Sequence, residues 1–117
     1  MSLIVYGYKK CSTCQKAYAY LKEKGVFFEE RPIRETPPSL EELRLMLMAV
    51  GNIKKLLNVS GVDYRKMDLK SKIPNMTEDA ILELLMSCGN LIKRPFAIDG
   101  TKGITGFKPE EWEKLWG

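Results

Sequence analysis

The chain has 117 residues, of which 44% are hydrophobic and 29% are charged, and its formal net charge is +4. This length predicts one compact domain over residues 1–117, and the absence of any long apolar run excludes a membrane-spanning chain. The N-terminus lacks the apolar stretch of a secretion signal, so we expect a cytoplasmic protein. The sequence contains no histidine, which removes the most common general base and the most common zinc ligand.

The basic residues are spread along the sequence and usually alternate with acidic residues. This pattern is typical of solvated helix faces, not of a surface that binds nucleic acid. We therefore expect no direct contact with nucleic acid and none with a membrane. Nothing in the pattern demands more than a monomer.

The first part of the chain predicts a strand, a helix and a second strand. Residues 3–6 form a β-branched and aromatic run that ends at Gly7. Apolar residues recur at helical spacing from Cys14 to Lys24, and Gly25 ends this helix. Residues 26–33 are typical of a second strand. Short connections between these elements predict a right-handed parallel unit.

The middle of the chain predicts helices. Ser39 and Glu42 form a capping box before an apolar series that ends at Gly51. Shorter helices are expected over residues 53–57 and 64–69, and a longer helix begins at Thr77 and ends near Cys88. Residues 39–90, approximately, are therefore expected to form a helical insertion between the sheet-forming parts.

The last part of the chain predicts a hairpin and a final helix. Residues 95–107 alternate as two strands around an Asp99-Gly100 turn, and Pro109 begins the last helix. Trp112 and Trp116 are spaced for packing of that helix on the core. The order βαβ, helices, ββα predicts an α/β fold, thioredoxin-like, with an inserted helical subdomain.

Two cysteines, Cys11 and Cys14, stand where the first strand turns into the first helix. Their spacing allows a disulfide without rebuilding of the backbone. Unpaired N–H groups at the helix start, together with Lys9, Lys10 and Lys16, stabilise a thiolate there. Cys11 lies outside the first turn and is the expected nucleophile, whereas Cys14 is held by the helix and is the expected resolving thiol.

A zinc site is the alternative interpretation of the two cysteines. Only one further cysteine, Cys88, is present and there is no histidine, so a ligand set of four would need a carboxylate close by chance. We therefore expect redox chemistry and no metal. Cys88 lies near a helix C-terminus, where the dipole disfavours a thiolate, and we expect it to be a packed structural thiol.

The sequence resembles the arsenate reductase (ArsC) family, specifically its small Spx-related members. The resemblance runs from end to end and rests on four segments: Cys11-Ser12-Thr13-Cys14, Pro37-Pro38-Ser39, Leu91-Ile92-Lys93-Arg94-Pro95 and Gly106-Phe107-Lys108. It implies that Cys11 is the redox nucleophile, that the bond before Pro95 is cis, and that Arg94 points toward Cys11. There the guanidinium would stabilise a thiolate or bind an oxyanion.

The resemblance implies that the arsenate-reducing members of the family use a single cysteine and three arginines. This chain departs from that pattern. Lys108 stands where one arginine is expected, and another is replaced near Leu57-Asn58. Such a set should hold a tetrahedral oxyanion more weakly. Thr13 and Lys108 are the candidate substrate-binding residues. Thr13 is equally suited to cap the helix, and Lys108 to be an ordinary surface lysine.

The leading functional hypothesis is a thiol–disulfide redox protein, an oxidoreductase with Cys11 as nucleophile, Cys14 as resolving thiol and Arg94 as support. No bound cofactor is expected, and the resemblance implies glutathione with glutaredoxin, or thioredoxin, as the reductant. Cys14 also matches the disulfide switch of Spx, a transcription regulator that binds the α subunit of RNA polymerase. A redox-sensing regulator of that kind and a glutaredoxin-dependent arsenate reductase are therefore the two alternatives.

Overall fold

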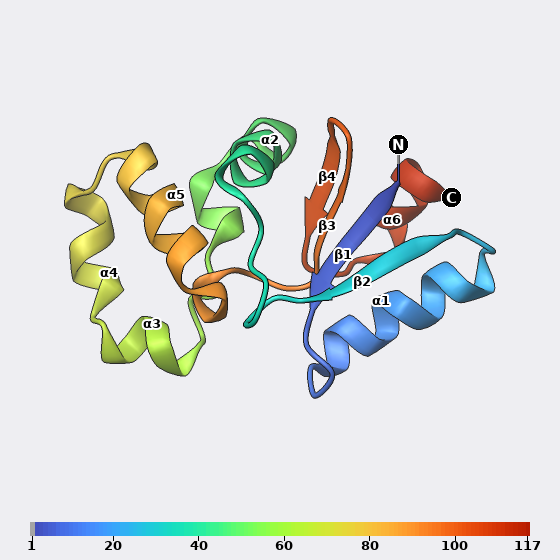
Figure 1. Ribbon diagram of the computed structural model, residues 1–117, viewed down its shortest axis with the longest axis horizontal. Coiled ribbons are helices and arrows are strands. Elements are labelled where there is room, and N and C mark those ends of the chain that lie inside the picture. Colours follow the sequence, from blue (N-terminus) through green and yellow to red (C-terminus); the bar gives the residue numbers. More distant parts are fainter. Residues whose placement is uncertain (1) are drawn as a thin grey trace.

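In the computed structural model, which describes residues 2–117, four strands form one mixed sheet in the order β2-β1-β3-β4 (Figure 1). Strand β1 (Leu3–Gly7) is parallel to β2 (Phe28–Pro32). Strand β3 (Phe96–Asp99) is antiparallel to both β1 and β4 (Lys102–Thr105). The parallel pair confirms the predicted strand–helix–strand unit, and the sheet confirms the α/β class.

The helices fall into two groups beside the sheet. In Figure 1 the first and last helices lie along the sheet, whereas the remaining ones form a separate group at its other side. In chain order the helices are α1 (Ser12–Glu23), α2 (Leu40–Val50), α3 (Val62–Lys66), α4 (Leu69–Lys72), α5 (Glu78–Ser87) and α6 (Pro109–Trp116). Single turns of 3-10 helix lie at η1 (Ile53–Leu56), η2 (Ile73–Asn75) and η3 (Gly89–Leu91). No helix within residues 2–117 is long and apolar enough to cross a membrane.

The sheet separates two apolar clusters, because successive side chains of a strand point to opposite faces. On one face Leu3 and Val5 pack with α1 and with Trp112, which is completely buried. On the other face Tyr6 and Phe96 pack with residues of α2 and α5. The buried Trp112 confirms that the C-terminal helix packs on the core, as its sequence predicts.

Local signals explain the helix ends. The Ser39–Glu42 capping box is present in full, and Gly51 ends α2 with a φ of 76°, in the left-handed region that favours glycine. Thr77 caps α5 by accepting a hydrogen bond from the backbone N–H of Ala80. These predicted boundaries are confirmed.

Some predicted boundaries are wrong. The single helix expected over residues 64–69 is two helices, α3 and α4, because Asp68 adopts a φ of 51° and interrupts them. The hairpin turn lies one residue later than expected, since Asp99 still pairs with Lys102 across the ladder. The second strand begins at Phe28, because Phe27 is 96% exposed and lies outside the ladder. The start of α1 agrees with the sequence, since the helix begins at Ser12, with Cys11 just before it as the N-cap and Cys14 in its first turn.

Candidate functional site

Cys11 lies at the N-cap of α1, with extended backbone angles (φ −86°, ψ 112°). Its Sγ accepts a hydrogen bond from the backbone N–H of Cys14 over 3.3 Å. Its own N–H donates to the carbonyl of Tyr8 over 3.0 Å, which closes the loop before the helix. The half-buried sulfur therefore sits where backbone N–H groups and the positive end of a 12-residue helix stabilise negative charge.

Cys14 is completely buried in the first turn of α1. Burial raises the pKa of its thiol to about 12, helped by a hydrogen bond with Cys11 and by the charge of Cys11. Gly7 lies against it: a Cβ at Gly7 would be 3.2 Å from the Cys14 Sγ and 2.2 Å from the hydroxyl of Tyr18. Cys14 therefore stays protonated at neutral pH, while the Cys11 sulfur is accessible, so the two thiols are chemically distinct.

Arg94 follows the segment that leads into β3, and its peptide bond to Pro95 is cis. Its guanidinium lies 5.7 Å from the centre of the Tyr8 ring, over which Arg34 also lies, at 3.9 Å. The charge of Arg94 acts to lower the pKa of Cys14, against the larger effect of burial. One guanidinium nitrogen, Nη1, is buried and has no hydrogen-bond partner within residues 2–117. Arg94 therefore has an unpartnered donor and lines the same groove as Cys11.

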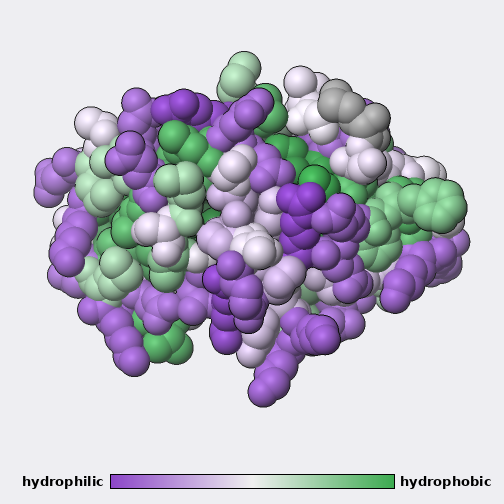
Figure 2. Space-filling view, in the orientation of Figure 1, coloured by the Kyte–Doolittle hydropathy of each residue, from purple (hydrophilic) through white to green (hydrophobic). Residues whose placement is uncertain are grey.

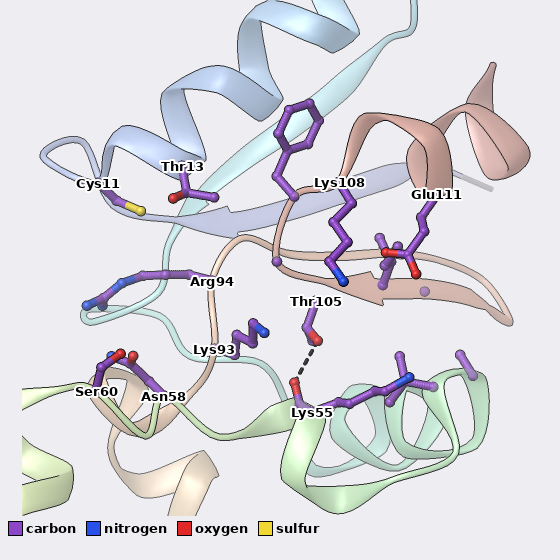
Figure 3. A pocket seen from close by; sticks show the side chains of 16 residues that line it. Cys11, Thr13, Lys55, Asn58, Ser60, Lys93, Arg94, Thr105, Lys108 and Glu111 are labelled. Carbon is purple, nitrogen blue, oxygen red and sulfur yellow. Dashed lines mark hydrogen bonds between the residues drawn. The ribbon is translucent and has the colours of Figure 1, made fainter.

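A groove of about 630 Å³ opens beside Cys11 (Figure 3). Cys11, Thr13, Arg94 and Lys108, which the sequence singles out, all line it. Cys14 does not line it, because its side chain is buried behind Cys11. Figure 3 shows Cys11, Thr13 and Arg94 toward one end of the groove and Glu111 at the other, with Lys108 between them.

The sequence did not single out several polar residues that line the groove, among them Lys55, Ser60 and Lys93, and it indicated Asn58 only as a replaced position. A short ladder brings these segments together. The N–H of Asn58 donates to the carbonyl of Leu91, and the N–H of Lys93 donates to the carbonyl of Leu56, both over 2.8 Å. The signals available in the sequence were the position of Lys93 next to Arg94 and the lysine pair that follows Gly51.

The loop that carries Lys108 is fixed from three sides. The N–H of Gly106 donates to the Pro95 carbonyl over 2.9 Å, and the Trp112 indole donates to the Gly106 carbonyl over 3.0 Å. The hydroxyl of Thr105 donates to the Lys55 carbonyl over 2.6 Å, the contact dashed in Figure 3. These bonds hold the loop before α6, the end of β4 and the turn η1 together around the groove.

The groove is strongly positive. Four cations line it, Lys55, Lys93, Arg94 and Lys108, and Glu111 is the single acidic lining residue among residues 2–117. The ion pairs within the described residues, Arg31–Glu29 and Arg44–Asp79, both lie outside it. Clefts with one sign of charge concentrate ions of the opposite sign, so the groove attracts anions toward Cys11.

Among the described residues, the groove has no cluster of metal ligands, and Cys88 lies away from it. Over residues 2–117, no group of three or more cysteine, aspartate or glutamate side chains is placed to hold a metal ion. Cys88 lies at the C-terminal end of α5, half-buried, and packs against the apolar cluster between the sheet and α2. It does not line the groove.

The model of the ArsC family matches residues 6–115, nearly the whole chain. The chain belongs to the ArsC family. The solved structure of an ArsC-family-related protein from Bacteroides fragilis is 42% identical and superposes with a TM-score of 0.92 over 98% of each chain. The predicted family and the predicted thioredoxin-like fold are therefore confirmed.

The relatives of this ArsC-family chain include a protein described as uncharacterized and proteins described as regulators. YusI of Bacillus subtilis is 48% identical over 117 residues, which cover 99% of each chain. The regulatory protein MgsR of the same organism is 32% identical over 97% of this chain and 89% of its own. The global transcriptional regulator Spx of Enterococcus faecalis is 27% identical over 93% of this chain and 82% of its own. The chain thus combines an ArsC-family fold with Spx-type relatives.

Proposed function

We propose that this ArsC-family protein is a thiol–disulfide redox protein in which Cys11 attacks and Cys14 resolves. The difference between the two thiols supports this proposal most strongly. The Cys11 sulfur borders the groove and accepts an N–H bond at the helix start, whereas Cys14 is buried with a pKa of about 12. A nucleophile needs access and stabilised charge, and a resolving thiol needs only to stay within reach until the first exchange is complete.

The reaction runs in two exchanges. The Cys11 thiolate attacks one sulfur of a substrate disulfide, the substrate S–S bond breaks, and the other sulfur leaves with the electron pair as a thiolate. Cys14 then loses its proton to solvent and attacks the Cys11 sulfur, which releases the second substrate thiolate. The substrate is reduced and the protein is oxidised to the Cys11–Cys14 disulfide.

Other residues of the groove and an external reductant complete the proposed redox cycle. Arg94, with its unpaired guanidinium nitrogen, stabilises the negative sulfur during each exchange. Thr13 and Lys108 contact the substrate from the walls of the groove. A thiol reductant, glutathione with glutaredoxin or a thioredoxin, reduces the Cys11–Cys14 disulfide again, and a reducing cytoplasm is the compartment that suits this cycle.

The test is disulfide mapping of protein oxidised in a glutathione redox buffer. We expect mass spectrometry to find a Cys11–Cys14 linkage in the wild type and in Cys88→Ser. Cys14→Ser should accumulate a mixed disulfide on Cys11, and Cys11→Ser should accumulate neither product. Pairing of Cys88 with Cys11 or Cys14 as the main product would contradict the proposal.

A second candidate function, a redox-sensing regulator that contacts RNA polymerase, is supported by the similarity to MgsR and Spx. The same disulfide would then change a binding surface instead of turning over a substrate. A pull-down with the C-terminal domain of the polymerase α subunit, using reduced and oxidised protein, tests it. Binding that depends on redox state would support it, and a lack of binding in both states would remove it.

Arsenate reduction is supported by the positive charge of the groove and by the similarity to a solved structure described as a possible arsenate reductase from Streptococcus mutans, which is 35% identical over 95% of this chain. Lysine is a point charge and lacks the planar fork with which arginine grips an oxyanion, and Arg94 is the one arginine lining the groove. We expect arsenite formation with glutathione and glutaredoxin to match that of a Cys11→Ser control. A clear excess over this control would make arsenate reduction the primary activity.

A further inference from the structure

The groove beside Cys11 is larger than a single oxyanion requires. Its volume of about 630 Å³ falls within the range of about 300–1,000 Å³ that accommodates whole small molecules. It runs from Cys11 to Glu111 in Figure 3, past Lys93 and Lys108. The part of the groove beyond Cys11 can therefore hold the rest of a substrate molecule whose sulfur reacts with Cys11.

The groove combines apolar lining residues with exposed cations. Ala49 and Val50, at the end of α2, line it together with Ile104 and Phe107. Gly103 is placed so that a Cβ there would be 2.9 Å from the sulfur of Met46, which shows how closely β4 packs on α2. A lining that is partly apolar and partly charged can contact the carbon atoms of an extended chain as well as its carboxylates, whereas a compact ion would use the charged groups alone.

Within the part of the chain that the structure describes, the cations of the groove form no ion pair. Lys55, Lys93, Arg94 and Lys108 are all absent from the ion pairs that the described residues form. The Nη1 donor of Arg94 is buried and unpartnered as well. In the view of Figure 2, hydrophilic side chains are spread over much of this face of the molecule, with pale and hydrophobic patches between them. The positive charge of the groove is therefore free to interact with the negative charges of a bound molecule.

From this placement we propose that the groove binds an extended, acidic segment of a polypeptide, whose cysteine exchanges with Cys11 while its carboxylates lie against Lys93, Lys108 and Lys55. The inference rests on the proposed redox function and names the substrate class for it. Opposite charge across such an interface raises the rate of encounter and selects the partner.

The exchange is the one already described, with a peptide disulfide as the oxidant. The Cys11 thiolate forms a new S–S bond with one peptide, and the other peptide leaves as a thiolate with the electron pair. In Cys14→Ser the reaction stops there, so each encounter leaves one peptide attached to the protein. This variant isolates the step in which the groove acts.

The experiment compares three symmetric heptapeptide disulfides that differ only in the residues flanking a central cysteine: glutamate, glutamine or lysine. The rate of mixed-disulfide formation is measured by mass spectrometry with Cys14→Ser protein. At low ionic strength we expect the glutamate peptide to react about tenfold or more faster than the lysine peptide. The ratio should shrink in 0.5 M salt, since the Debye length at 1 M is only about 3 Å and at 0.1 M about 10 Å.

Charge variants locate the effect. The triple change Lys55→Gln, Lys93→Gln and Lys108→Gln should bring the glutamate-to-lysine ratio close to one. The matched control is Lys70→Gln with Lys72→Gln on α4, which keeps the lysines of the groove and should preserve the ratio. Equal loss of the ratio in both variants would show that only net charge matters and would overturn the proposal.

A final comparison separates a polypeptide segment from a small anionic thiol. A disulfide of the dipeptide Glu-Cys carries the charge but offers far less chain to contact the groove than the heptapeptide does. We expect it to react several-fold more slowly than the glutamate heptapeptide, and an equal rate would reject the polypeptide. The glutamine peptide tests the redox function by itself: if it fails to react with Cys11, the proposed function fails, whereas a ratio near one with good reactivity rejects only this inference.

Discussion

The contrast between the two thiols predicts strongly selective alkylation. The structure raises the pKa of Cys14 from an ordinary value of 9.0 to about 12, which is about three pH units. At pH 8 the thiolate fraction then falls from about one-tenth to about one in ten thousand, a reduction of about a thousandfold. Burial also denies access to the reagent, because Cys14 is 0% exposed. Iodoacetamide should therefore modify Cys11 and leave Cys14 intact in the folded, reduced protein.

The assay is a time course of labelling at pH 8, followed by peptide mapping, with protein unfolded in guanidinium as the reference. A Cys11→Ser variant distinguishes the causes of the shift. It removes the effects of the Cys11 sulfur, a hydrogen bond and an electrostatic interaction, but keeps the burial of Cys14, which is the largest cause of the raised pKa. Cys14 should therefore remain far slower in this variant than in unfolded protein.

Two results would refute this reasoning. Labelling of Cys14 at a rate close to that of Cys11 in folded wild type would show that Cys14 is neither buried nor protonated. Labelling of Cys14 at the unfolded rate in Cys11→Ser would show that Cys11, and not burial, suppresses its reactivity. In either case the assignment of nucleophile and resolving thiol would lose its physical basis.

Two further predictions concern stability. The pKa values of Cys14 and Tyr6 are both raised to about 12 in the folded protein, so the stability they contribute is complete below about pH 9. The free energy of unfolding should fall as the pH rises from about 9 toward 12, by up to about 1.4 kcal/mol per pH unit for each group. Urea unfolding measured from pH 8 to 11 tests this, and an unchanged free energy of unfolding would contradict it. Gly7→Ala should lower the free energy of unfolding by about 1–3 kcal/mol, because its Cβ would meet the Tyr18 hydroxyl at 2.2 Å. The loss should be smaller in a Tyr18→Phe background, and an equal loss in both would show that the hydroxyl is not the obstacle.

Local features were predictable because they depend on residues close together in the sequence. The capping box of Ser39 and Glu42 joins residues three apart, and Cys11 and Cys14 share one helix start. Hydrophobic periodicity likewise indicates which side of α6 carries Trp112 to the core. Short-range hydrogen bonds and periodicity are set by backbone geometry alone, so they can be inferred without the fold.

The chemical contrast at the thiol site depended on tertiary packing. The burial of Cys14 arises because Gly7 on β1 lets Tyr18 and the Cys14 sulfur approach the strand closely. The positive groove arises because the ladder between Leu56–Asn58 and Leu91–Lys93 places Lys55 and Lys93 near Cys11. These residues are more than 30 positions apart, and only the path of the chain between them decides whether they meet. The sequence by itself therefore determined the reactive motif and the order of elements, whereas the tertiary structure decided which thiol is exposed and what charge surrounds it.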